Sequence, residues 1–247
     1  MNKKKWLVVS MVVFLSVFAL FGCLPSTNGE PEEKLHIKVI LPETTPEDVT
    51  EIYLIGSYCD WNFDEARTSE VKTEDGQKYA EFELQITEFP LEYKYTYGAS
   101  WDYEELDENG EGLGGNRRID FKPTADIQDV VLNWKGTDKI DYTELQEDIT
   151  VTFIVHVPEG TEDDEDKIYM RGSFTSWDVG TPLQKTDEGT YTCEVEVKSY
   201  TTLRFKFLRK DGWDFVEKQA DGEEMLNRVA ILTDDSTITC LVEKWAQ

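Results

Sequence analysis

Apolar and polar residues alternate with a period of two in short runs along most of the chain. In residues 151–157 every second side chain is a valine or a phenylalanine. This period is typical of a half-buried β-strand, because successive side chains of a strand point to opposite faces. Similar runs occupy residues 82–86, 91–97, 193–197 and 203–207, with turn-forming clusters between the runs. The pattern predicts an all-β protein.

The N-terminus has a different pattern, which is typical of an export signal. A basic stretch at residues 3–5 precedes an almost wholly apolar run at residues 6–21, which is short for a membrane-spanning helix. Residues 20–23 then resemble a bacterial lipobox, in which the cysteine, here Cys23, is lipidated and becomes the new N-terminus. Phe21 is bulkier than the small residue that this motif prefers. An ordinary cleaved signal and an uncleaved anchor remain alternatives, and all three predict export from the cytoplasm.

The remainder of the chain is a duplication. Residues 35–42 resemble residues 151–158, and further matches follow in the same order to the end of each copy. Six of the seven tryptophans form three matched pairs, and the seventh lies in the signal. The pairs are Trp61 with Trp177, Trp101 with Trp213, and Trp134 with Trp245.

The repeat sets the expected boundaries. Each copy holds several short strands over about 100 residues, a size that suits an immunoglobulin-like antiparallel β-sandwich. We therefore expect two tandem β-sandwich modules after the signal segment. The expected parts are a lipoprotein signal peptide at 1–22, a flexible tether at 23–33, module one at 34–134, a linker at 135–148 and module two at 149–247.

The composition excludes several classes of partner and site. The chain has 25 Lys and Arg against 51 Asp and Glu, a net charge of −26, which disfavours nucleic acid as a partner. Its only histidines are His36 and His156, and the cysteines beyond Cys23 lack metal-ligand spacing, so we expect no metal and no cofactor. The sequence does not decide whether Cys193 and Cys240 form a disulfide.

An ordered set of motifs, present in both copies, resembles the starch-binding modules of carbohydrate-binding module family 20 and the related glycogen-binding modules of family 48. The first motif is Tyr-x-x-Gly-Ser-x-x-x-Trp, at residues 53–61 and 169–177. An aromatic-Lys-aromatic strand, a Trp followed by an acidic residue, and an Asn-Arg pair then follow in each copy. The resemblance covers nearly all of both modules.

The resemblance implies one surface site in each module. In these families two tryptophans stack on successive glucose rings, while the lysine and the asparagine bond sugar hydroxyls. Asp102 and Asp214 are weaker candidates, because family 20 usually has glutamate there. Carried over, the carbohydrate-binding residues are Trp61, Lys94, Trp101 and Asn116 in module one, and Trp177, Lys206, Trp213 and Asn227 in module two.

A structural role competes with each of these assignments. We expect Trp134 and Trp245 to lie in the core, because each ends the last apolar strand of its module, and the four tryptophans of the two sites to be exposed in loops. Arg117 and Arg228 are expected to form structural ion pairs. Lys94 alternates with two tyrosines and must point to the opposite face of its strand.

These observations predict a non-catalytic lipoprotein, anchored by its lipid at the bacterial cell envelope or surface, that binds α-1,4-linked glucans such as starch, glycogen or maltodextrins. Separate amylases or sugar transporters are the expected partners. The alternative is an envelope scaffold that uses the β-sandwich for docking to proteins. We expect no enzyme: the sequence has no nucleophile elbow, histidine-based triad or phosphate loop, and the two modules leave no room for a large catalytic barrel.

Overall fold

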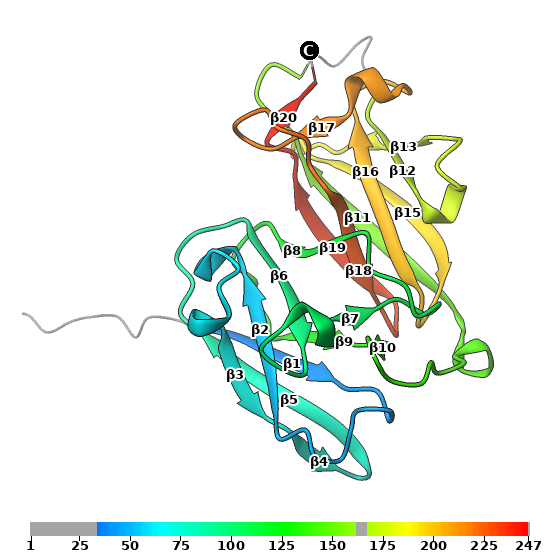
Figure 1. Cartoon of the computed structure of the whole chain (residues 1–247). Coiled ribbons are helices and arrows are strands. Elements are labelled where there is room, and N and C mark those ends of the chain that lie inside the picture. Colours follow the sequence, from blue (N-terminus) through cyan, green and yellow to red (C-terminus); the bar gives the residue numbers. More distant parts are fainter. Residues whose placement is uncertain (1–33, 162–166, 247) are drawn as a thin grey trace, which may run out of the picture. The chain divides into compact units, whose positions relative to one another are not determined.

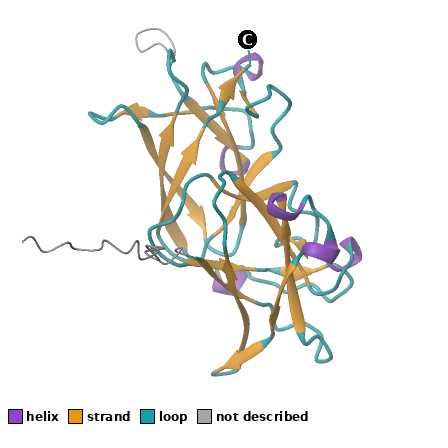
Figure 2. Cartoon of the chain, turned by 90° about the vertical axis from the view of Figure 1, so that its left-hand side faces the viewer, coloured by secondary structure: helices purple, strands orange, loops and turns teal. Residues whose placement is uncertain are grey.

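A computed structural model describes residues 34–161 and 167–246, and these residues form an all-β protein, as predicted (Figure 1). Helical structure among them is limited to short 3₁₀ turns (Figure 2). None of these turns has the length or the apolar character that a membrane-spanning helix requires. The predicted signal peptide, the tether and Cys23 lie outside the described residues.

We call residues 34–134 the first half and residues 148–246 the second half. The first half contains one four-stranded sheet in the order β4-β5-β1-β9, and its strands β8, β6, β2 and β3 lie in a second sheet. Its elements are β1 (Leu35–Ile40), β2 (Glu51–Gly56), η1 (Ser57–Cys59), η2 (Phe63–Glu65), β3 (Arg67–Glu70), β4 (Lys72–Glu74), β5 (Gln77–Leu84), β6 (Leu91–Thr96), η3 (Trp101–Tyr103), β7 (Glu105–Leu106), β8 (Gly115–Ile119), β9 (Ile127–Val130) and β10 (Asn133–Trp134).

The second half repeats this order. Its four-stranded sheet is β14-β15-β11-β19, and its strands β13, β12, β16 and β18 belong to a second sheet. Its elements are β11 (Asp148–His156), β12 (Tyr169–Gly172), η5 (Ser173–Thr175), β13 (Thr181–Pro182), β14 (Gln184–Lys185), β15 (Tyr191–Lys198), β16 (Thr202–Leu208), η6 (Trp213–Phe215), β17 (Glu217–Lys218), β18 (Asn227–Ile231), β19 (Ser236–Leu241) and β20 (Lys244–Trp245).

The apolar side chains on one face of the alternating strands form the cores. In β11 the odd-numbered residues from Ile149 to Val155 are buried and their neighbours are partly exposed. Each such side chain contributes about 1.5–3 kcal/mol when fully buried, so one face of the strand is fixed towards the opposing sheet. Trp134 and Trp245 belong to the cores of their halves, which confirms the prediction for both.

A buried arginine lies in each core. Arg117 donates to Glu105 and to Asp129, and its guanidinium lies over the ring of Tyr95. Arg228 pairs in the same way with Glu217 and lies over Phe207. The prediction that both arginines form structural ion pairs is confirmed.

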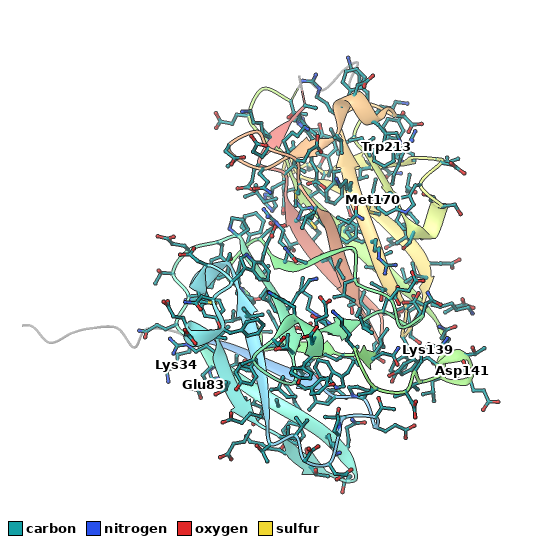
Figure 3. All side chains as sticks on the ribbon, viewed as in Figure 1. Lys34, Glu83, Lys139, Asp141, Met170 and Trp213 are labelled. Atoms are coloured by element: carbon teal, nitrogen blue, oxygen red, sulfur yellow. The ribbon has the colours of Figure 1, made fainter. Side chains whose placement is uncertain are left out.

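The segment at 135–147 connects the two halves and packs against both. Tyr142 is buried, donates its hydroxyl to Leu132 O and stacks on Tyr200 with an interplanar angle of 10°. The segment contains the short turn η4 (Thr143–Leu145), and Figure 3 labels Lys139 and Asp141 on it. These contacts restrict the movement of the connecting segment.

The halves also share a sheet. Strands β8 and β18 pair in parallel and join the strands of both halves in one eight-stranded sheet, in the order β13-β12-β16-β18-β8-β6-β2-β3. Val229 and Ile231 of the second half pack with Leu113, Val130 and Leu132 of the first half in a common apolar cluster. The two halves therefore form one compact unit.

Candidate functional site

Each half presents two tryptophan side chains next to each other. In platform one, the pair Trp61 and Trp101, the ring centroids are 6.1 Å apart and the rings are tilted by 44°. In platform two, the pair Trp177 and Trp213, the distance is 6.0 Å and the tilt is 39°. Both halves therefore build the same arrangement.

One ring of each platform is exposed. Trp101 is 38% exposed and Trp213 is 45% exposed, while Trp61 and Trp177 are half-buried. The expectation from sequence was exposure of all four tryptophans, and it is correct for Trp101 and Trp213. The partial burial of the other two comes from the turn that carries them.

A strained turn fixes the first tryptophan of each platform. Trp61 has φ = 58° and Trp177 has φ = 65°, and the residue before each is also left-handed. Residues other than glycine rarely adopt this conformation, and each instance costs of order 1–3 kcal/mol. The amide N–H groups of Trp61 and Trp177 donate to Gly56 O and Gly172 O, 3.1 Å away in both cases. The surrounding structure thus holds both indoles in one uncommon orientation.

The glycine of the same motif is required for steric reasons. A Cβ atom on Gly56 would lie 2.2 Å from Glu92 O, and one on Gly172 would lie 2.5 Å from Arg204 O. Each glycine therefore permits close approach of two strands at the point where the tryptophan turn begins. The motif Gly-Ser-x-x-x-Trp is explained by this backbone contact and by the turn that follows it.

The lysine and the asparagine of the first half lie on the outer face of the sheet, opposite the core. β6 and β8 pair with Tyr93 opposite Arg117, both pointing into the core, so Lys94 and Asn116 lie beside each other on the other face. Lys94 Nζ lies 3.6 Å from Glu104, in the loop that follows Trp101. Asn116 donates to Glu92 at 2.9 Å.

The second half places its polar residues equivalently. Phe205 and Arg228 pair and point inwards, so Lys206 and Asn227 share the outer face. Lys206 Nζ donates to Met225 O at 2.6 Å, and Asn227 donates to Gly114 O of the first half at 3.2 Å. An ammonium group carries three N–H donors and an amide side chain two, together with an acceptor oxygen, so these contacts leave capacity for a ligand.

Platform one includes an aromatic residue that the sequence analysis missed. Phe63 packs edge-on against Trp101, with centroids 5.1 Å apart. The equivalent position in the second half is Val179, which is 66% exposed. Comparison of the two copies reveals the residues that they share. Phe63 has no aromatic counterpart in the second half, so this comparison does not detect it.

Platform two has a different support. Arg171 lies on β12 opposite Lys206, and its guanidinium is 5.2 Å from the centroid of the Trp213 ring. It also donates to Trp177 O and to Asp211. The matching position on β2 is Ile55, which is fully buried. A cation–π contact therefore supports platform two, where an apolar residue occupies the same place in platform one.

The neighbouring acidic residues do not form a metal centre. Asp102 and Asp214, the weaker candidates, are exposed beside their tryptophans. Among residues 34–161 and 167–246 no group of three or more His, Cys, Asp or Glu side chains could hold a metal ion. The cysteines at 59, 193 and 240 are free thiols.

The fold and these platforms define an all-β protein that presents the same pair of tilted indoles twice. No family model matches the chain. An α-amylase from Niallia circulans is 29% identical over 100 residues, which is 39% of this chain and 8% of that enzyme. The chain therefore matches only a small part of the length of this relative.

Similar solved structures include a family 26 carbohydrate-binding module from Eubacterium rectale in complex with maltoheptaose. It is 10% identical, with a TM-score of 0.25 over 83% of this chain and 92% of that one. Family 41 carbohydrate-binding modules from streptococcal virulence factors, described as recognising α-glucan, are 13% identical, with a TM-score of 0.22 over 85% of this chain and 94% of that one.

Proposed function

We propose that the protein is a non-catalytic α-glucan-binding lipoprotein of the bacterial cell surface, with one site in each half. The observation that carries the proposal is the tilted pair of indoles, at 6.1 Å and 44° in one half and at 6.0 Å and 39° in the other. Its recurrence in two copies that differ at the neighbouring residues 63 and 179 points to selection for the pair itself.

The geometry suits a curved glucan. A pyranose has an apolar C–H face that stacks on an indole, and rigid aromatic side chains offer such a surface at low entropic cost. Successive rings of an α-1,4-glucan turn relative to one another, whereas the rings of a flat β-1,4-glucan lie in one ribbon. Two indoles tilted by about 40° therefore favour the curved polymer.

Polar groups beside each platform support sugar binding. Lys94 and Asn116 lie together on the outer face in the first half, as Lys206 and Asn227 do in the second. These are the donors that the resemblance to families 20 and 48 assigns to sugar hydroxyls. The similarity to 100 residues of an α-amylase also agrees with an α-glucan as ligand.

The resemblance of residues 20–23 to a lipobox supports a lipid anchor, which would hold bound polysaccharide at the cell surface for separate amylases or sugar transporters. Mass spectrometry of the membrane fraction tests this part of the proposal. A diacylglycerol on Cys23, absent from Cys23→Ser, is expected; an unmodified secreted chain would contradict it.

Native affinity electrophoresis tests glucan binding. The full chain is run through gels that contain soluble starch, glycogen, dextran or hydroxyethylcellulose, beside the double variant Trp101→Ala, Trp213→Ala. Phe121→Ala is the matched control, because Phe121 is an aromatic residue of similar exposure (37%) outside both platforms.

We expect starch and glycogen alone to retard the chain and the control, and the double variant to migrate freely. Retardation that survives in the double variant would place the site elsewhere. Unchanged mobility of the folded chain in every gel would leave the scaffold function as the better explanation.

A further inference from the structure

The pairing between β8 and β18 determines on which face of the eight-stranded sheet each platform lies. Asn227 lies opposite Gly115, Arg228 opposite Asn116, and Val229 opposite Arg117. The sequence repeat makes Asn227 equivalent to Asn116, so equivalent residues are staggered by one position. A stagger of one residue moves every side chain of a strand to the other face of the sheet.

The packing around the junction agrees with this inversion. Arg228 points into the core of the second half, yet its partner across the junction is Asn116, which points outwards from the first half. Val229 and Ile231 point away from the core of the second half and pack against Leu113, Val130 and Leu132 of the first half. The outer face of one half therefore continues as the inner face of the other.

Each platform lies on the outer face of its own half. Arg171, on the outer face, contacts both tryptophans of platform two. Lys94, on the outer face of the first half, pairs with the loop that carries Trp101. The two platforms consequently lie on opposite faces of one eight-stranded sheet.

The twist of the sheet does not bring them back to the same side. Strands β6 and β16, beside the platforms, are three steps apart in the sheet order. At roughly 20–25° per step the sheet turns by roughly 60–75° between them. Starting from opposite faces, the platforms still point more than a right angle apart.

Buried ion pairs hold this arrangement rigid. Arg228 of the second half pairs with Asp120 of the first, Arg118 pairs with Glu243, and Arg204 pairs with Asp107. The first two pairs join side chains that are at most 17% exposed. The connecting segment cannot reorient one half freely against the other.

From this geometry we infer that the protein bridges two separate α-glucan chains, one on each face, and does not engage neighbouring turns of a single chain with both sites. The inference rests on the proposed function. Two sites joined by a flexible linker gain affinity for one polymer when both engage it together, and the gain is lost where geometry forbids simultaneous contact. Sites fixed on opposite faces favour cross-linking instead.

Light scattering and calorimetry test the inference on the full chain, under conditions in which scattering shows a monomer without glucan. Maltoheptaose, a short glucan, measures the number of sites and the affinity of each. Long soluble amylose reports bridging. Trp101→Ala and Trp213→Ala each remove one platform and serve as matched single-site variants.

We expect the native chain to bind two maltoheptaose molecules and to cause growth of amylose particles that is largest at an intermediate ratio of protein to glucan. Excess maltoheptaose should reverse the growth, a result that does not depend on any variant. Each single-site variant should bind one maltoheptaose and give less than about a tenth of the growth.

The two proposals fail differently. Two bound maltoheptaose molecules without particle growth would overturn bridging and leave glucan binding intact. Growth that is undiminished in both single-site variants would also overturn bridging. Absence of maltoheptaose binding to the folded native chain would overturn both proposals.

Discussion

Arg228 and Asp120 form a buried ion pair between the two halves of the chain, with Nη1 2.5 Å from Oδ2. In the first half the equivalent arginine, Arg117, pairs with Asp129 of its own half. The repeat puts Cys240 where Asp129 would be, so the first half supplies the missing carboxylate. Burial alone would lower the pKa of Arg228, but Glu217 and Asp120 raise it, and the guanidinium stays charged.

Asp120→Ala should therefore destabilise the fold strongly. It leaves Arg228 with one carboxylate fewer and removes a partner of Arg118 and of the Leu241 amide. Removing one member of a buried pair costs about 3–5 kcal/mol. Urea unfolding measures the loss, with Asp126→Ala at an exposed position as the control, expected within about 0.5 kcal/mol of the native chain. Equal stability of the two variants would show that the pair is dispensable.

The third aromatic residue of platform one should raise affinity. Phe63→Val removes the edge-on contact that helps to hold the Trp101 ring in place, which is worth about 0.5–1.5 kcal/mol. The contact exists without ligand, so this free energy is an upper bound on the loss of binding, and maltoheptaose binding at that platform should weaken by up to roughly tenfold. Val179→Phe is the reciprocal change and should strengthen platform two. Calorimetry measures each effect with the other platform removed, by Trp213→Ala or by Trp101→Ala. No change from Phe63→Val would mean that Trp101 is held by other contacts.

The glycine before each tryptophan turn should not tolerate a side chain. In Gly56→Ala the new Cβ meets Glu92 O, and such overpacking typically costs about 1–3 kcal/mol. The displaced turn should also weaken platform one. Gly112→Ala is a suitable control, because a Cβ atom added there would meet no other atom within 4 Å and its φ is not left-handed. Thermal unfolding of the two variants gives the comparison, and similar melting temperatures would argue against the steric role.

Alkaline pH should destabilise the fold through Cys240. Burial raises the pKa of its thiol to about 12, whereas a thiol in the unfolded chain titrates near 8.5. Between these values the unfolded chain loses a proton that the folded chain keeps, so the free energy of unfolding falls as pH rises. The thiol's contribution is complete below about pH 8.5 and is lost progressively towards pH 12.

Urea midpoints between pH 8 and pH 9 test this prediction. Burial also raises the pKa values of Tyr93 and Tyr95 well above 10, but tyrosines of the unfolded chain titrate near pH 10, so these residues contribute little in that range. The decline should be less steep in Cys240→Ala. Parallel declines in the two proteins would assign the effect to other groups.

Much of the fold could be predicted because it depends on local pattern. Period-two alternation identified strands such as β11, and the repeat predicted the second copy from the first. The burial of Trp134 follows from its position at the end of an apolar strand, and the ion pairing of Arg117 agrees with its expected structural role. The division into two modules with a linker stays a prediction, as do the lipid on Cys23 and the location at the cell surface.

The junction could not be predicted in this way. The pairing of β8 with β18 depends on register between strands that are distant in sequence, and no alternation pattern encodes it. Arg171 and Phe63 were missed because self-comparison detects only what the copies share. The half-burial of Trp61 depends on a left-handed turn built from residues other than glycine, which turn composition alone does not signal.

The parallel contact between β8 and β18 also removes a hazard. A strand at the border of a sheet exposes unpaired N–H and C=O groups that can recruit another chain into an aggregate. Strand β8 of the first half pairs with the border strand β18 of the second half, and β18 does the same for β8. The duplication therefore leaves neither border unpaired. A cut within residues 135–148 followed by separation of the halves would uncover both, and the freed pieces would be prone to exchange partners with other copies or to aggregate.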